Sequence, residues 1–159
     1  MSPDNSNIKN QINVTNIIYL ALSAGLILFF LITLFFIQGT NKEVNNDIDT
    51  IFTFLVPVLG LIMMFSSRMI YNQIISKYDS GKNLLQKILQ YRTAKIISWA
   101  MIESVSLLAL MATMLTSNYL YAAVFIFLFG YFILLRPSKE SLIRDMRLNT
   151  DESDLILKG

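Results

Sequence analysis

The chain has 159 residues and a net charge of +2, with 54% hydrophobic and only 15% charged residues. This composition is more apolar than that of an ordinary soluble domain. The absence of cysteine and histidine excludes disulfides, thiol chemistry, histidine bases and the usual zinc or haem ligands. We therefore expect a membrane protein with no cofactor and no nucleic-acid partner.

The chain opens with a polar stretch followed by a long apolar run. Residues 1–16 contain five asparagines and are expected to form a disordered tail. Residues 17–37 are apolar except for Ser23 and Thr33, and are long enough to cross a membrane. A cleaved signal peptide is the rival interpretation. The run exceeds the usual 7–15 apolar residues, only Lys9 precedes it and no small-residue cleavage site follows, so we expect a retained span.

Three further apolar runs follow, at residues 51–71, 96–115 and 119–135. Lipid offers no hydrogen-bond partner to the backbone, so continuous apolar runs predict spanning helices. A β-barrel would need alternating apolar and polar residues. We expect an all-α protein whose residues 17–136 form a bundle of four transmembrane helices, followed by a helical tail at 137–159.

The basic residues predict the orientation of these spans. Twelve of the 13 lie in the N-terminal stretch, between spans two and three, or after span four, and only Lys42 lies on the other side. Both termini are therefore expected in the cytoplasm, in a multi-pass protein of the bacterial inner membrane.

Amphipathic helices are expected on the cytoplasmic side after spans two and four. The helix at 82–95 either lies in the membrane interface or continues into span three, and it would contact anionic lipid or dock a partner. The bases assigned to headgroup contact are Lys82, Lys87, Arg92, Arg136 and Arg144.

One carboxylate, Glu103, interrupts the third span. It lies about 12 Å past Lys95 along a helix, within the hydrocarbon region, where a charge costs several kcal/mol. Arg68, near the cytoplasmic end of span two, is the candidate ion-pair partner, and Ser106 could add a hydrogen bond. The alternatives are a proton- or cation-responsive Glu103, a Glu103 facing lipid or a partner, and an Arg68 that extends to lipid phosphate.

Pro57 and Gly60 interrupt the second span. Proline removes a helical hydrogen bond and predicts a kink, which improves packing or acts as a hinge. The pairs Ala21 and Gly25, and Ala100 and Ser104, have the spacing of small residues at close helix contacts.

The second half of the chain resembles a known group. The stretch "YRTAKIISWAMIESVSLLALMATMLTSNYLY" followed by "LRPSKESLIRDMRL", within residues 82–148, is similar to a family of small uncharacterised bacterial four-span membrane proteins. The resemblance implies architecture and a bacterial inner membrane, and it implies no activity.

The sequence carries two functional hypotheses. No catalytic constellation or phosphate-binding loop is present, so we expect a non-enzymatic membrane component that self-associates or serves as an accessory subunit. The alternative is a small proton- or cation-coupled transporter that uses Glu103.

Overall fold

The computed structural model describes residues 3–38, 46–77 and 83–158, and their regular structure is entirely α-helical. This confirms the all-α class. The six helices are α1 (Pro3–Gln38), α2 (Asn46–Ser76), α3 (Leu84–Thr116), α4 (Tyr119–Leu134), α5 (Lys139–Asp145) and α6 (Thr150–Lys158).

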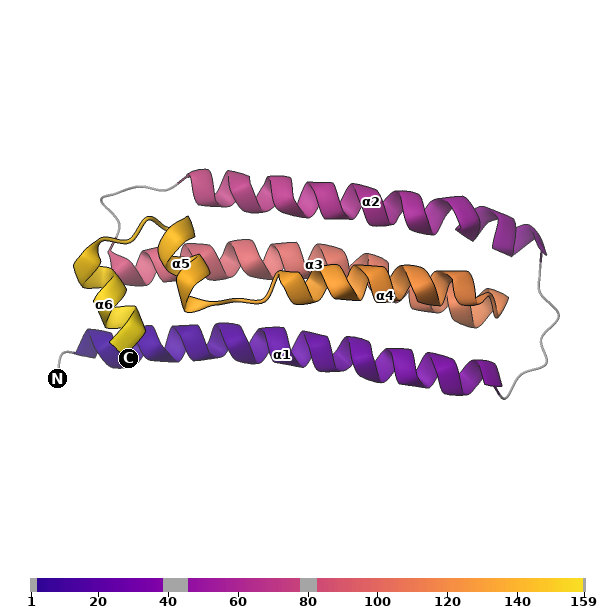
Figure 1. Ribbon diagram of the computed structural model, residues 1–159, viewed down its shortest axis with the longest axis horizontal. Helices are drawn as coiled ribbons and strands as arrows, with labels where there is room; N and C mark the ends of the chain where they lie inside the picture. Colours follow the sequence, from indigo (N-terminus) through magenta and orange to yellow (C-terminus); the bar gives the residue numbers. More distant parts are fainter. Residues whose placement is uncertain (1–2, 39–45, 78–82, 159) are drawn as a thin grey trace.

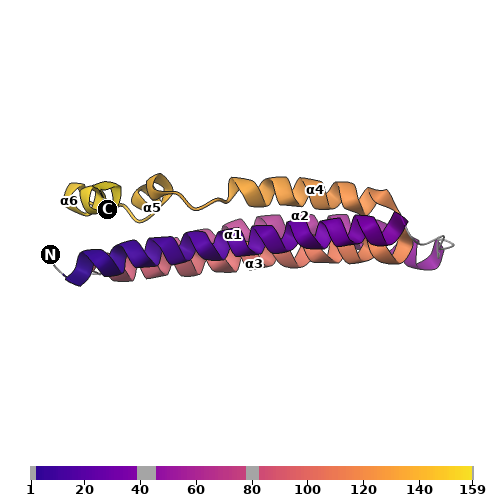
Figure 2. The same ribbon diagram turned by 90° about the horizontal axis from the view of Figure 1, so that it is seen from below.

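The long helices lie side by side and alternate in direction (Figure 1). Helix α3 lies between α1 and α2 (Figure 1), and α4 lies on one side of the group that these three helices form (Figure 2). We call the end where α5 and α6 lie the tail-side end, and the end where Ser117 joins α3 to α4 the turn-side end. Pro3 and Lys158 both lie at the tail-side end.

Three helices are long and apolar enough to cross a membrane, namely α1 from Asn7, α2 from Asp47, and α3. A fourth candidate is formed by α4 together with α5, which meet at 72° across a short break. These helices mark the chain as a membrane protein. In the most apolar window of α3, 50% of the residues are buried, against 17% in α1 and 11% in α2, so α3 is the central packing helix.

Aromatic side chains fill the core between α1, α3 and α4. Trp99 and Phe132 are fully buried, and the Tyr19 ring lies 5.3 Å from both rings. Phe125 extends this stack toward the turn-side end, with its ring 4.9 Å from that of Phe30. Lipid is as apolar as these side chains, so close packing rather than escape from water holds this part of the structure.

Hydroxyl groups in the apolar part of the helices bond within their own helix. Thr33 donates to the carbonyl of Phe29 at 2.8 Å, and Thr113 donates to that of Ala109 at 2.8 Å. This i to i−4 bonding satisfies the hydroxyl without a neighbouring helix. These hydroxyls therefore do not link one helix to another.

The expectation of a disordered N-terminal tail is wrong. Helix α1 begins at Pro3 and continues without a break through the first predicted span. Ile8 and Thr15 are buried, and Ile8 packs in a cluster with Ile88 and Ile156. These contacts with α3 and α6 supply the stabilisation that the asparagine-rich composition lacks.

The helix predicted after span two is continuous with span three, which decides between the two alternatives. Asn83 caps α3, with its side chain accepting a hydrogen bond from the backbone N–H of Gln86 at 2.9 Å. The helix then runs unbroken to Thr116. Lys82, assigned to lipid contact, lies outside the described residues.

Candidate functional site

The structure does not form the predicted pair between Glu103 and Arg68. Within the described residues, no ion pair or hydrogen bond reaches the Glu103 carboxylate, and Arg68 is exposed. Ser67 is fully buried, so the next residue points about 100° away from the packed face of α2. The positions of Glu103 and Arg68 along their helices are compatible with an ion pair, but the directions in which the two side chains point are not.

The other residues of the predicted site separate in the same way. The Ser106 hydroxyl donates to the carbonyl of Ile102 at 2.7 Å rather than to Glu103. Pro57 lies inside α2, which continues past it to Ser76. Gly60 is buried where α2 meets α4, and an added Cβ would lie 3.7 Å from Leu128. These two positions shape helix contact, and no bond links them to Glu103.

Glu103 instead borders a face of α3 that the other described residues leave uncovered. It is half-buried, and its neighbours Ala100 and Ser104 are exposed. Ile97 and Met111 extend the same face in both directions and are 36% and 51% exposed. The hydroxyl of Ser104 donates within the helix, to the carbonyl of Met101 at 2.8 Å. A carboxylate and two small residues thus share one uncovered surface.

Most of the bases assigned to headgroup contact bind other parts of this chain. Lys87 is buried, and its ammonium group donates to both carboxylate oxygens of Glu152 in α6, at 2.7 and 3.0 Å. The prediction that Lys87 contacts lipid is wrong, because α6 folds back over it. Arg92 donates to the side chain of Gln11 in α1. Arg144 lies 3.1 Å from its neighbour Asp145 and remains largely exposed.

The tail-side end also holds a polar cluster that was not predicted from the sequence. Lys95 is buried, with its ammonium nitrogen 5.0 Å from the Tyr71 ring centre and 5.5 Å from that of Tyr91. The Tyr71 hydroxyl donates to the Asp145 carboxylate at 2.5 Å, and the hydroxyls of Tyr91 and Ser141 are hydrogen-bonded. The acidic residues of the otherwise basic C-terminal tail were the one signal for such a cluster. The sequence alone does not show that this tail folds back onto α2 and α3.

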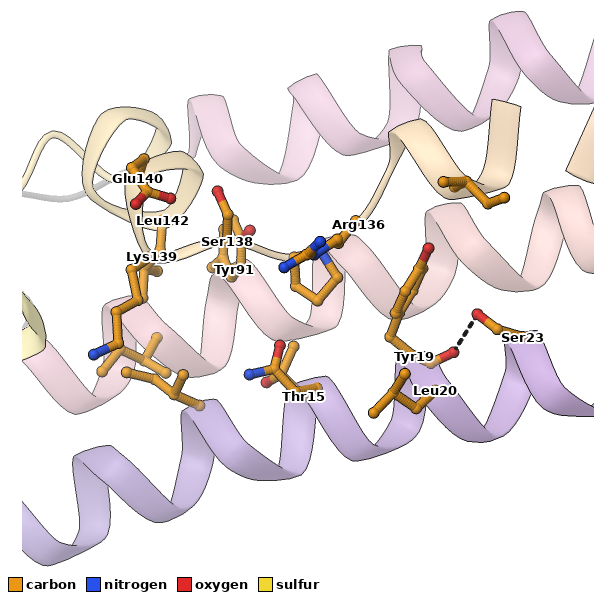
Figure 3. Close-up of a pocket in the computed structure, with 15 residues that line it drawn as sticks. Thr15, Tyr19, Leu20, Ser23, Tyr91, Arg136, Ser138, Lys139, Glu140 and Leu142 are labelled. Atoms are coloured by element: carbon orange, nitrogen blue, oxygen red, sulfur yellow. Dashed lines mark hydrogen bonds between the residues drawn. The ribbon is translucent and has the colours of Figure 1, made fainter. Parts of the chain in front are cut away.

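A cavity of about 720 Å³ opens between α1, α3 and the connection from α4 to α5. Its walls include Thr15 and Tyr19 of α1 and Tyr91 of α3 (Figure 3). Arg136 and Lys139 line it from the connection and the start of α5. Neither of these two basic side chains forms a hydrogen bond or ion pair with the described residues. The cavity exists because α4 ends at Leu134 while α1 and α3 continue.

The turn-side end carries a smaller polar cluster centred on Asp49 in α2. The Tyr121 hydroxyl lies 2.8 Å from both the backbone oxygen and Oδ1 of Asp49, so it can donate to either. The Asn118 side chain donates to the same carboxylate at 3.1 Å, and Thr53 lies 3.1 Å from the Tyr121 hydroxyl. These contacts attach α2 to the turn between α3 and α4.

The described residues contain no group of three or more acidic, histidine or cysteine side chains that could hold a metal ion. No protein-family model, curated protein or solved structure matches the chain. A functional assignment must therefore come from the residues themselves.

Proposed function

We propose that the protein is a non-enzymatic, multi-pass component of the bacterial cytoplasmic membrane that associates with a second copy of itself through the uncovered face of α3. The observation that carries this proposal is Glu103, a carboxylate at membrane depth that has no partner among the described residues. A charge facing lipid costs several kcal/mol, whereas a helix partner can offer it hydrogen bonds.

The residues around Glu103 suit helix association. Ile97, Ala100, Ser104, Leu107 and Met111 alternate in spacings of three and four, which is the heptad repeat of left-handed helix pairs. All five are exposed or half-buried in the single chain. Alanine and serine let two backbones approach closely in a membrane. The stripe therefore has both the period and the small residues of a helix-packing seam.

A second copy is a partner that fits this stripe by symmetry. A two-fold axis normal to the membrane brings the same α3 surface of two copies together at the same depth. Each Glu103 then faces the seam near Ser104 of the other copy, where a carboxyl group and a hydroxyl can exchange a hydrogen bond. In the accessory-subunit form of this proposal, a helix of a different membrane protein covers the same face of α3.

The test is the association of the purified protein in lipid vesicles, measured by energy transfer between labelled copies on dilution with lipid. Ala100→Leu places bulk in the seam and is expected to weaken association at least about tenfold. The matched control is Gly25→Leu on the uncovered face of α1, where an added Cβ meets nothing within 4 Å. A wild-type monomer, or equal effects of the two changes, contradicts self-association through α3.

A small proton- or cation-coupled transporter is the second candidate. It is favoured by the same lack of an internal partner, which leaves the Glu103 carboxylate free to exchange a proton. Glu103→Gln separates the two functions, because glutamine keeps hydrogen-bonding capacity but cannot carry a proton. Proton flux that wild-type vesicles show and Glu103→Gln vesicles lack supports the transporter, and unchanged association without any flux supports the seam.

The cytoplasmic placement of the tail-side end has its own test. In intact cells, a membrane-impermeant thiol reagent is expected to label Lys42→Cys and to leave Lys139→Cys unlabelled until the membrane is opened. Both variants start from a chain without cysteine, so each reports one site. The reverse labelling pattern contradicts the orientation.

A further inference from the structure

We infer that the cavity between α1, α3 and the connection from α4 to α5 is a binding site for the headgroup of an anionic phospholipid. This site is separate from the α3 seam, because no residue that lines it belongs to that stripe. It rests on the membrane location of the chain and not on self-association.

The cavity lies at the level where a headgroup would be found. The rings of Trp99 and Tyr19 pack against each other beside it. The indole N–H of Trp99 donates at 3.1 Å to the carbonyl of Leu135, the residue directly after α4. Tryptophan and tyrosine favour the boundary between hydrocarbon and headgroups. Beyond this level α4 gives way to a connection that turns away toward α5 (Figure 3).

The polar wall of the cavity offers donors suited to a phosphate. Arg136 and Lys139 bring two positive charges, and the Asn16 side chain adds an amide. None of the three side chains is used in a hydrogen bond or ion pair with the described residues. Lys87, Arg92 and Arg144, by contrast, bind Glu152, Gln11 and Asp145 of this chain. Two bases are thus left for an external anion at one place.

A carboxylate at the edge of the cavity limits the affinity of this site. Glu140 is on α5, and its pKa is lowered by hydrogen bonds from its own backbone N–H and from Ser138, and by the charges of Lys139 and Arg136. It therefore stays ionised at neutral pH and partly offsets the two bases. In Figure 3 its carboxylate lies on the far side of Leu142 from α1.

The apolar part of the wall favours a lipid over a free phosphate. Leu20 of α1 and Ile133 of α4 line the cavity and are 63% and 49% exposed. A free phosphate would leave these side chains uncovered, whereas the glycerol and first methylenes of a lipid would cover them. A volume of about 720 Å³ is within the range of small-molecule sites. Basic pockets between membrane helices bind anionic headgroups in the same manner.

The single tryptophan provides a native reporter for the test, because the Trp99 ring lies 5.3 Å from that of Tyr19 in the cavity wall. The full chain is placed in phosphatidylcholine vesicles, and a fraction of the lipid is replaced by phosphatidylglycerol or phosphatidylcholine brominated on its acyl chains. We expect brominated phosphatidylglycerol to quench Trp99 at a several-fold lower fraction than brominated phosphatidylcholine. Equal quenching by the two lipids overturns the proposal.

Matched variants assign the preference to this cavity. Arg136→Gln and Lys139→Gln are each expected to reduce the preference for phosphatidylglycerol about fivefold, and Glu140→Gln to increase it. Arg68→Gln in α2 and Lys77→Gln just after α2 remove the same charge from exposed positions and are expected to leave the preference unchanged. A loss of preference that is as large in these controls indicates general surface attraction and overturns the site.

A competition arm distinguishes the lipid from a soluble phosphate. Millimolar inorganic phosphate or glycerol phosphate, added at constant ionic strength, is expected to leave the quenching by brominated phosphatidylglycerol unchanged. Full release of that quenching by either anion overturns the assignment to a lipid.

Discussion

The two ends of the molecule are closed in different ways. At the tail-side end, α6 is held by the Lys87–Glu152 pair, whose side chains are only 5% and 16% exposed, and α5 is held by the bond from Tyr71 to Asp145. At the turn-side end, one carboxylate, Asp49, gathers Tyr121 and Asn118. Both ends join segments far apart in sequence. The tail-side end does so through a buried ion pair and a hydrogen bond to two different acids, whereas the turn-side end gathers its hydrogen bonds on one acid.

The part between the two ends shows why the polar contacts lie where they do. There the hydroxyls bond within their own helices, and the contacts between helices are aromatic stacks and small residues. Inter-helix bonds in hydrocarbon add little stability, since an unfolded chain in the membrane also finds partners. Hydrogen bonds and ion pairs between segments therefore contribute most at the two ends, where they determine which segments are held together.

The largest expected effect is on the buried ion pair at the tail-side end. Lys87→Met removes the ammonium group that binds both oxygens of the Glu152 carboxylate and is expected to destabilise the docking of α6 by about 3 kcal/mol. Hydrogen exchange of the amides in α6, residues 150–158, measures this. Lys77→Met, at an exposed position just after α2, is the control. The comparison fails if both changes leave the exchange of α6 unaltered.

The next effect compares the loss of one hydroxyl group at each end. Tyr121→Phe removes a hydroxyl that reaches both the Asp49 backbone and its carboxylate, and is expected to cost about 2 kcal/mol. Tyr71→Phe removes a single bond to Asp145 and is expected to cost about 1 kcal/mol. Denaturation of the two variants in the same detergent mixture ranks them. If Tyr71→Phe loses more stability than Tyr121→Phe, the stronger hydroxyl contact is at the tail-side end and the comparison is wrong.

A smaller effect is expected at the exposed ion pair of α5. Arg144→Ala removes a contact with Asp145 in which the arginine side chain is 77% exposed, so the loss of stability is expected to stay within about 0.5 kcal/mol. Unfolding at low and high salt measures it. A loss comparable with that of Lys87→Met would show that burial is not what separates these two pairs.

The smallest effect concerns pH. The folded pKa of Glu140 is lowered below its unfolded value, so this residue stabilises α5 above the unfolded pKa and loses that contribution as the pH falls through the folded pKa. Glu140→Gln is expected to remove this acid-dependent part of the exchange of the α5 amides. If the exchange of the α5 amides depends on pH in the same way in Glu140→Gln, a group other than Glu140 causes that dependence.

The sequence predicted the helices better than it predicted their contacts. The apolar runs at 51–71 and 96–115 lie within α2 and α3, and the run at 119–135 matches α4 to within one residue, because length and hydropathy are local properties. The error at Glu103 and Arg68 had a different origin. Rise along a helix gives the depth of a residue, but the direction in which it points depends on how the helix is packed. Ser67 rather than Arg68 lies on the packed face of α2.

The docked tail could not be predicted for a related reason. Lys87 was assigned to lipid because it is a base beside apolar residues, and Glu152 was one of several acids in a mixed tail. Only the three-dimensional path of residues 137–158 brings the two together. The same path covers Ile8, which explains why an asparagine-rich stretch that resembles a disordered tail is helical.

The contact between Ile8 and Ile156 also sets an order of events during synthesis. The first turns of α1 pack on a residue that the ribosome adds about 150 positions later. At ordinary rates of translation this is a wait of roughly 7 to 30 seconds, during which the helices between them can enter the membrane. Throughout that interval the start of α1 is exposed on the side where α6 will dock. The tail-side end is therefore the last part of the described structure to be completed.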